Sequence, residues 1–313
     1  MSSLKTTSGA SLATEVLQAF DNLNGPQPGY RPAHAKGILV IGRFTPAESA
    51  PALSRAPHLA RSATPVTVRF SDFAGIPAVP DNDPNASPRG LAVRFHLAEH
   101  VHTDIIAHSV DGFPVRTAEE FVEFLRAVYA SVHSTEKPSA IEKFLGSHPA
   151  ALAFVQTPKP WPSSFFKESY YSVSAYRFVN REGTSRFGRY RIRPDGAGEY
   201  LDDATAAKRA PDYLFEDIKT RLARGSVKMR IAVQIAAGED VVDDSTAHWP
   251  ADRPEMDFGT LELCSILQNN DSEQQHIIFD PIPRVDGIES SGDPLLEPRA
   301  DVYLASGRRR RTQ

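Results

Sequence analysis

The sequence has little sulfur and no excess of charge of one sign. Cys264 is the only cysteine among 313 residues, which excludes any internal disulfide. It lies in an alternating apolar run, so we expect a buried, unreactive core thiol. The formal net charge of −4 and the pI of about 6.2 give no general reason to expect nucleic acid or an anionic membrane as a partner.

Long hydrophobic runs are also missing. No stretch reaches the roughly eighteen consecutive apolar residues that a membrane-spanning helix needs. The first thirty residues or so lack the basic, apolar and small-residue regions of a signal peptide. We therefore expect a cytoplasmic protein with no membrane partner. Its apolar content of 41% is enough for a large core, in one large domain or two small ones.

What the sequence does contain is short alternating runs of strand character, separated by clusters of proline, glycine, asparagine and aspartate. Because few helices separate successive runs, about eight of them predict a closed antiparallel barrel with flanking helices, in the α+β class. The strands are expected at 37–44, 65–73, 90–98, 104–110, 171–179, 185–192, 227–236 and 260–267. Helices are expected at 11–24, with Ser11 as the N-cap, and at 119–132, 141–145, 150–155 and 213–223.

The C-terminal segment places an arginine and a tyrosine four residues apart. On a helix, Arg299 and Tyr303 would lie on one face within contact distance, where the guanidinium would favour a deprotonated phenolate. A phenolate is a known ligand of haem iron. The alternative is a frayed basic tail, and the run from Arg308 to Arg311 is more typical of a solvated tail than of a nucleic-acid site.

Two further segments carry residues suited to chemistry. His34 lies just before a predicted strand and could shuttle a proton, although an isolated histidine is usually a surface or core residue. In the next strand, alternation places Arg69 and Ser71 on the face opposite Val68 and Phe70. If that polar face points into the barrel, Arg69 needs an anionic partner such as a carboxylate ligand; a solvent-facing pair is the alternative.

From about residue 30 to its end, the sequence resembles the haem catalases. Seven segments stand in the order found in that family: 31–37 (RPAHAKG), 68–71 (VRFS), 83–95 (DPNASPRGLAVRF), 249–250 (WP), 259–263 (GTLEL), 279–289 (FDPIPRVDGIE) and 299–303 (RADVY). The chain looks shorter than a typical catalase, without most of the N-terminal arm and without any region beyond the last helix. In this it resembles the minimal catalase-related peroxidases.

The resemblance implies an N-terminal helix and short arm over residues 1–29 and a catalase-like core over 30–313. The core would hold the eight-stranded barrel, a helical interlude at about 118–170 and a proximal haem helix at about 294–310. Tyr303 would be the iron ligand, held ionised by Arg299, and His34 the distal acid and base, oriented by Ser71. The haem contacts would come from residues of two kinds: Arg31, Arg69 and Arg310 on the propionates, and Phe113, Phe121 and Phe279 around the porphyrin.

The sequence departs from the family at two positions. His108 stands where family members have asparagine, which can donate a hydrogen bond to peroxide but cannot take its proton, whereas histidine can do both and is bulkier. Ala33 replaces a valine, which would widen the approach to iron. It is also not the threonine of the allene oxide synthase branch, so the resemblance to that branch is weaker. His58, His133 and His148 are expected to be ordinary surface residues.

The predicted function is a haem b (iron protoporphyrin IX) peroxidase that reduces hydrogen peroxide or organic hydroperoxides with a small-molecule electron donor and has weak catalase activity. The alternatives are a true small catalase, a haem carrier or sensor without turnover, and a haem-free ligand-binding barrel with an arginine tail for polyanions. We expect a monomer or homodimer rather than an interlocked tetramer, because the arm and the C-terminal region of large catalases are missing.

Overall fold

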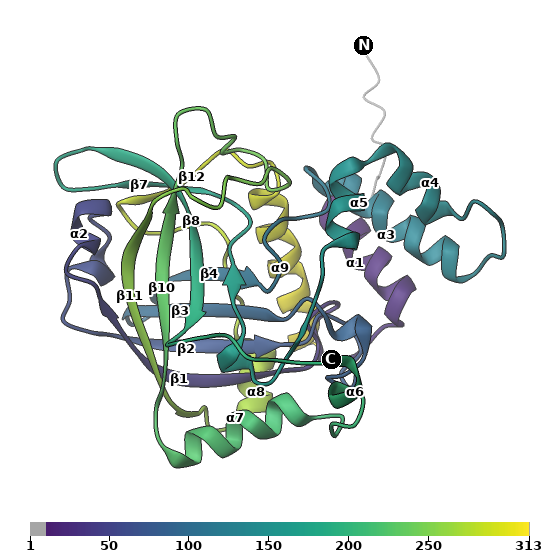
Figure 1. Cartoon of the computed structure of the whole chain (residues 1–313), viewed down its shortest axis with the longest axis horizontal. Helices are drawn as coiled ribbons and strands as arrows, with labels where there is room; N and C mark the ends of the chain where they lie inside the picture. The colour runs from purple at the N-terminus through teal and green to yellow at the C-terminus, as the bar shows by residue number, and fades with distance from the viewer. Residues whose placement is uncertain (1–10, 313) are drawn as a thin grey trace, which may run out of the picture.

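The computed structural model describes residues 11–312, so the first ten residues of the predicted N-terminal arm lie outside the described residues. Its centre is a closed antiparallel barrel (Figure 1). Going round the barrel, each strand pairs with the next in the order β11–β1–β2–β3–β4–β6–β8–β10, and β10 returns to β11. The strands are β1 (Gly37–Pro46), β2 (Thr64–Ser71), β3 (Gly90–Ala98), β4 (Val101–His108), β6 (Tyr170–Tyr171), β8 (Ser185–Pro194), β10 (Val227–Ile235) and β11 (Glu255–Ile266). The predicted eight-stranded barrel is confirmed.

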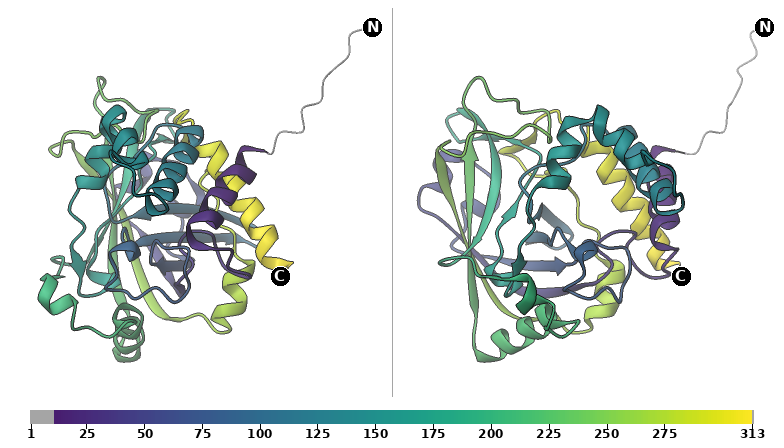
Figure 2. Two further views of the ribbon diagram at one scale, coloured as in Figure 1. Left: turned by 90° about the vertical axis from the view of Figure 1, so that its right-hand side faces the viewer. Right: turned by 45° about the vertical axis from the view of Figure 1, so that its right-hand side comes forward.

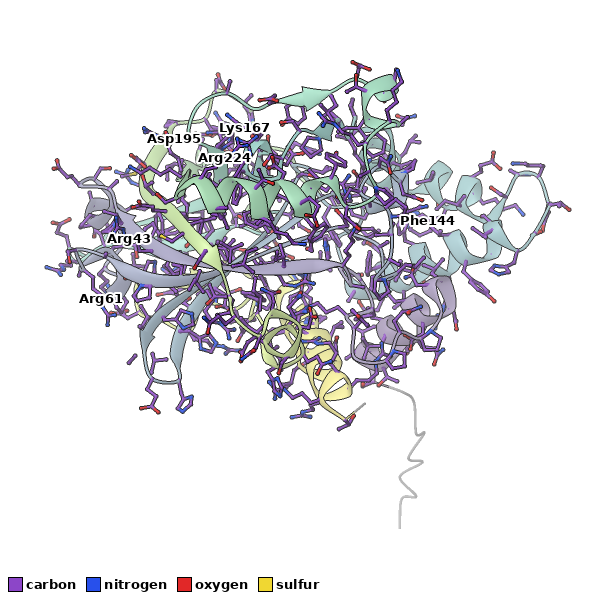
Figure 3. The ribbon with its side chains drawn as sticks, turned by 90° about the horizontal axis from the view of Figure 1, so that it is seen from below. Arg43, Arg61, Phe144, Lys167, Asp195 and Arg224 are labelled. Carbon is purple, nitrogen blue, oxygen red and sulfur yellow. The ribbon has the colours of Figure 1, made fainter. Side chains whose placement is uncertain are left out.

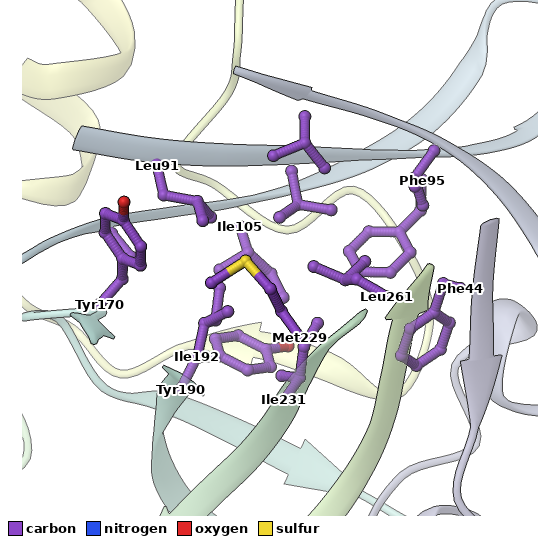
Figure 4. Close-up of a cluster of buried hydrophobic side chains, with 14 of the residues drawn as sticks. Phe44, Leu91, Phe95, Ile105, Tyr170, Tyr190, Ile192, Met229, Ile231 and Leu261 are labelled. Atoms are coloured by element: carbon purple, nitrogen blue, oxygen red, sulfur yellow. The ribbon is translucent and has the colours of Figure 1, made fainter. Parts of the chain in front are cut away.

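The barrel interior is filled by large apolar side chains, and Figure 4 shows part of this core. Phe44 and Phe95 meet edge to face with ring centroids 5.1 Å apart, and both are fully buried. Val68 and Phe70 belong to this core. Because side chains alternate along a strand, Arg69 and Ser71 therefore lie on the outer face of β2. The suggestion that Arg69 points into the barrel is wrong.

Most of the helical structure lies to one side of the barrel, whereas α2 (Ala50–Leu53) and α7 (Tyr213–Arg224) lie against other parts of it (Figure 1). In Figure 1 the helical part lies to the right, with α9 between it and the strands. Figure 3 shows Phe144 in this part, far from Arg43 and Arg61 at the other end of the barrel. The helices are α1 (Leu12–Asn24), α2 (Ala50–Leu53), α3 (Ala118–Val132), α4 (Ala140–Ser147), α5 (Pro149–Gln156), α6 (Asp203–Ala206), α7 (Tyr213–Arg224), α8 (Asn270–His276) and α9 (Leu296–Arg311). Short 3₁₀ turns span Pro57–Leu59, Pro84–Ala86 and Phe165–Lys167.

Helix α1 packs against both α3 and α9 (Figure 2). Its start is capped as predicted, because the Ser11 side chain accepts a hydrogen bond from the Thr14 amide. The apolar face of α1 joins a small core with α3 and α9, which contains Val16, Phe20 and Val302. Among the described residues, no helix is long and apolar enough to cross a membrane.

Several local predictions need correction. The single strand expected at 171–179 is two strands, β6 and β7 (Tyr176–Val179). The regular ladder ends after β6, where the Tyr190 amide donates its hydrogen bond to the Ser172 side chain instead of to a backbone carbonyl. Strand β7 extends the sheet beyond the barrel and pairs with β12 (Ile288–Ser290), while β5 (Trp161–Pro162) and β9 (Tyr200–Leu201) form a separate pair. Helices α2, α6 and α8 and strands β5, β9 and β12 were not predicted.

Three single residues are also corrected. Cys264 is exposed, not buried. It follows Leu263, which faces the barrel core, so its own side chain points outward. His58 is buried, not a surface residue, and its ring stacks on Phe95 with ring centroids 4.7 Å apart. His133 is exposed as expected, whereas His148 is half-buried against Phe144.

Candidate active site

A cavity of about 230 Å³ lies between the outer face of the barrel and helices α1, α3 and α9. The right-hand view of Figure 2 shows α9 alongside this face of the strands. All the residues that the sequence suggested for the site line this one cavity: Arg31, His34, Arg69, Ser71, His108, Phe113, Phe121, Phe279, Arg299, Tyr303 and Arg310. They come from six different parts of the chain, so the fold brings together residues as far apart in the sequence as Arg31 and Arg310.

Helix α9 carries the tyrosine and its arginine, one turn apart. The Arg299 Nη2 group donates to the Tyr303 hydroxyl at 3.4 Å, and the Arg299 guanidinium carbon lies 5.9 Å from the Tyr303 ring centroid. Arg299 Nη1 donates to the Ser174 hydroxyl at 3.4 Å. Burial alone would lower the pKa of Arg299, but the nearby Tyr303 and Tyr176 outweigh it and the pKa is raised. Arg299 is therefore a fixed positive charge beside the phenol.

His34 stands at the cavity end of β1, in a left-handed backbone conformation with φ of 57°. Its amide donates to the Phe73 carbonyl at 2.7 Å, and its Nδ1 is 3.1 Å from the Ser71 hydroxyl. Burial, followed by the positive charge of Arg69, lowers the pKa of His34 to about 3. The ring is thus neutral at ordinary pH and can accept a proton in a reaction.

The strand register places the polar residues of this wall in one row. Ser71 of β2 is opposite Gly90 of β3, and Gly90 is opposite His108 of β4. His108 Nδ1 accepts a hydrogen bond from the Val110 amide at 3.2 Å. Burial, then the charges of Arg299 and Lys159, lowers the pKa of His108 to about 3.

Three guanidinium groups meet at another part of the cavity. Arg31 donates to the carbonyls of Gln274 and Ile277 at 3.1 and 3.0 Å, and Arg310 also donates to the Ile277 carbonyl, at 3.1 Å. Burial and the charges of Arg69 and Arg310 lower the pKa of Arg31 well below its usual range. The pKa of Arg69 is lowered to about 9, mainly by burial and then by Arg310.

Among residues 11–312, no carboxylate lies within salt-bridge distance of these three arginines. Arg310 Nε is buried without a hydrogen-bond partner. Buried charges without a counter-ion are costly. The three arginines together therefore form a site suited to an anionic ligand.

The remaining walls are apolar. Phe113 and Phe121 contact each other with ring centroids 5.4 Å apart, and Phe20 of α1 meets Phe121 at 5.8 Å. Phe279 also lines the cavity, and the Arg94 guanidinium lies 5.2 Å from its ring centroid. A flat, largely apolar group carrying anionic substituents matches this lining.

Sequence reasoning missed several contributors to the cavity. Val16 and Phe20 of α1 line it, as do Phe154 of α5 and Val173. The apolar periodicity of α1 predicted a helix but not the neighbours of its apolar face. Gln274 of α8 was also missed; its Oε1 accepts from Arg69 Nε at 3.0 Å. Helix α8 is polar throughout, so it has no apolar pattern that could have revealed it.

The donor set fits haem better than a simple metal ion. Among the described residues there is no group of three or more histidine, cysteine, aspartate or glutamate side chains that could hold a metal. A haem would need only one protein ligand to its iron, and Tyr303 with Arg299 beside it can provide a phenolate. The uncompensated Arg31, Arg69 and Arg310 would meet its two propionates.

Comparisons with known proteins show which family the chain belongs to. The catalase family model matches residues 10–313. A catalase-related peroxidase of Mycolicibacterium paratuberculosis is 34% identical over 306 residues, covering 96% of this chain and 95% of the relative. A catalase-related peroxidase of Synechococcus elongatus is 29% identical, covering 93% and 86%.

Solved structures show the same fold. Catalase A from Saccharomyces cerevisiae superposes with a TM-score of 0.78 at 22% identity, covering 94% of this chain but 63% of that one. A bacterial catalase gives a TM-score of 0.79 at 22% identity, covering 99% and 63%. The chain thus spans less than two thirds of the length of these solved catalases. On the family match and on the relative that is 34% identical, the chain belongs to the catalase family.

Proposed function

We propose that this chain is a haem-dependent peroxidase that reduces hydrogen peroxide or organic hydroperoxides with an external electron donor and has weak catalase activity. One observation carries the proposal: the Arg299–Tyr303 pair and the His34–Ser71 pair line the same cavity. A haem ligand and a proton acceptor are the two groups that peroxide reduction requires of a protein. The two named catalase-related peroxidases support the same activity.

Haem is the cofactor of the catalase family, and we propose haem b. Tyr303 would hold the iron, with Arg299 keeping its oxygen anionic. Arg31, Arg69 and Arg310 would bind the propionates, while Phe113, Phe121 and Phe279 would pack against the ring. When bound, the haem would supply the electrons that cleave the O–O bond of the peroxide.

The residues of the chain would handle the proton. Neutral His34 can take the peroxide proton at Nε2 while its Nδ1 keeps the contact with the Ser71 hydroxyl, 3.1 Å away. It can then return that proton to the leaving oxygen, so that the oxygen departs as water or as an alcohol rather than as an anion. Burial and the neighbouring Arg69 disfavour a lasting positive charge on the ring. His34 would therefore release the proton readily.

We further propose that the electron donor is a small molecule, that the protein is a monomer or homodimer, and that it works in the cytoplasm. The chain matches the catalase-related peroxidases over nearly their whole length but spans less than two thirds of the solved large catalases.

The ligand assignment is tested by replacing Tyr303 with phenylalanine in the purified haem protein. The change keeps the ring and removes the oxygen, so we expect loss of the phenolate charge-transfer bands and of most bound haem. Tyr176→Phe is the matched control, because Tyr176 is buried near Arg299 but is absent from the cavity lining. An unchanged Tyr303→Phe spectrum would rule out this ligand.

A further inference from the structure

Two histidines line the cavity, and they differ in what their Nδ1 atoms contact. His34 Nδ1 lies 3.1 Å from the hydroxyl of Ser71, whereas His108 Nδ1 lies 3.2 Å from the backbone amide nitrogen of Val110. A hydroxyl can donate or accept a hydrogen bond, but a backbone N–H can only donate. The two rings are therefore not equivalent in the protons they can carry.

The partner of His108 determines its tautomer. Because the Val110 N–H points at Nδ1, that nitrogen must keep its lone pair free of a proton. In the neutral ring the single proton is then on Nε2, which makes this atom a hydrogen-bond donor. The ring could take a second proton only at Nδ1, and this would break the Val110 bond and leave two donors facing each other.

The surroundings of His108 act in the same direction. Burial disfavours a proton on the ring, and Arg299 and Lys159 are both near enough for their positive charges to add to this effect. Phe154 stands edge-on to His108 with ring centroids 6.3 Å apart, and Lys159 Nζ lies 5.2 Å from the same Phe154 ring. The Lys159 ammonium also donates to the Phe154 carbonyl at 3.0 Å, which holds it in place. A protonated His108 would thus be a further cation beside two existing ones.

His34 is under no such restriction. The Ser71 hydroxyl can rotate, so it accepts when His34 Nδ1 carries a proton and donates when it does not. His34 can therefore present either a bare or a protonated Nε2, as a general acid and base must. Of the two histidines in the cavity lining, only His34 can gain or lose a proton at Nδ1 without losing a hydrogen bond.

We propose that His108 is a fixed hydrogen-bond donor, which holds an oxygen of the bound peroxide through Nε2–H and never takes its proton. The inference rests on the proposed peroxidase function and sharpens it. It departs from the expectation that His108 both donates a hydrogen bond and competes for the substrate proton. In this account, His108 keeps the donor function of the family's asparagine, and its effect on substrate choice comes from its greater bulk.

Fluoride binding to the ferric haem protein tests the donor without catalysis. A bound fluoride ion accepts hydrogen bonds, and losing a donor to a charged group costs roughly tenfold or more in affinity. We expect His108→Leu to weaken fluoride binding by at least that factor. His108→Asn and His108→Gln, which keep an N–H donor, should stay within a few-fold of wild type. His133→Asn, on the exposed end of α3, is the control for a distant histidine.

The same variants are then compared in peroxide turnover. Asparagine and glutamine at position 108 should restore the rate with hydrogen peroxide that leucine loses, because both keep an N–H donor. Neither can act as a base, so their activity would show that position 108 need not take a proton. Equal fluoride affinity in wild type and His108→Leu would show that His108 does not donate a hydrogen bond to the bound ligand, and would overturn the proposal. Turnover lost to the same extent in the Asn, Gln and Leu variants would also overturn the proposal, because it would show that the imidazole itself takes part in proton transfer.

These outcomes are distinct from failure of the proposed function. A wild-type protein that binds haem and fluoride but oxidises no donor would refute the peroxidase function while the fluoride series still decides the role of His108. A wild-type protein that binds no haem would refute both.

Discussion

Gly90 has no side chain, and the His34 ring occupies the space that a side chain at this position would fill. A Cβ atom built on Gly90 would lie 2.6 Å from Nδ1 of His34 and 2.5 Å from the hydroxyl of Ser71, closer than such atoms pack. The same strand position is opposite Ser71 on one side and His108 on the other. The missing side chain at position 90 is therefore part of how the barrel wall orients its proton acceptor.

Replacing Gly90 with alanine should displace the His34 ring and break its contact with Ser71. We expect a loss of roughly tenfold or more in the rate of peroxide reduction, with haem content close to that of wild type, because misplaced acid–base groups lose most of their effect. Stopped-flow spectroscopy of the haem band gives the rate. Gly146→Ala in α4 is the control, since a Cβ there meets nothing within 4 Å. A Gly90→Ala variant as fast as wild type would contradict this role.

His34 should be essential for peroxide reduction, and its protonation state should not change with pH in the neutral range. General acid–base assistance contributes about 10²–10⁴-fold, so His34→Ala should slow peroxide reduction by at least the lower factor while haem stays bound. Because the pKa of His34 is lowered to about 3, the base form persists as pH falls through the usual histidine range. The wild-type kcat/KM should show no histidine step near pH 6.5. A loss below about tenfold in His34→Ala would remove His34 from this role.

Arg310 should matter more for haem than for folding. Burial and the charges of Arg311 and Arg309 lower the pKa of Arg310 to about 10. The charge of Arg310 in turn lowers the pKa of Arg31 and of Arg69, and none of the three has a carboxylate partner among the described residues. Arg310→Gln removes that repulsion but also a propionate contact. We expect haem dissociation to accelerate roughly tenfold, without a lower unfolding midpoint for the haem-free protein. Arg308→Gln, exposed on the same helix, should change neither, and equal effects of the two variants would contradict the propionate site.

The buried His58 predicts how stability depends on pH. Burial lowers its pKa from 6.5 to about 3, so between these values the unfolded chain binds a proton that the folded protein does not. Stability must therefore decrease as pH falls below 6.5, by about 2 kcal/mol from this residue at pH 5. Urea unfolding at pH 7.5 and pH 5 measures the difference, which should shrink in His58→Leu. His133→Leu, an exposed histidine, should leave it unchanged; if His58→Leu does the same, His58 is not the cause.

Most of the barrel could be predicted because its strands alternate strongly, one face being apolar. The same alternation could have predicted that Cys264 is exposed. Leu261 and Leu263 face the core, so Cys264 must point outward with Glu262. The burial of His58 could not be predicted in this way. It lies in a 3₁₀ turn that closes over Phe44 and Phe95, and one turn is too short for a periodic signal.

The site residues were placed by the resemblance to the catalases more than by local pattern. Alternation showed that Arg69 and Ser71 share a face, but not that helices α1 and α9 cover this outer face and enclose a cavity. The hydrogen bond from Val110 to His108 was also beyond sequence reasoning. It depends on the backbone path after β4, which bends so that an amide returns to the ring two residues earlier.

The central claim is tested most directly by steady-state kinetics with hydrogen peroxide, with and without a small phenolic donor, on the purified haem protein. We expect oxidation of the phenol at a rate that depends on the phenol concentration, with little oxygen evolved when the phenol is absent. His108→Asn should raise oxygen evolution several-fold without raising phenol oxidation, because asparagine keeps the N–H hydrogen-bond donor of His108 but is less bulky. Oxygen evolution near the diffusion limit in the wild type, unaffected by the donor and by His108→Asn, would instead establish a small catalase.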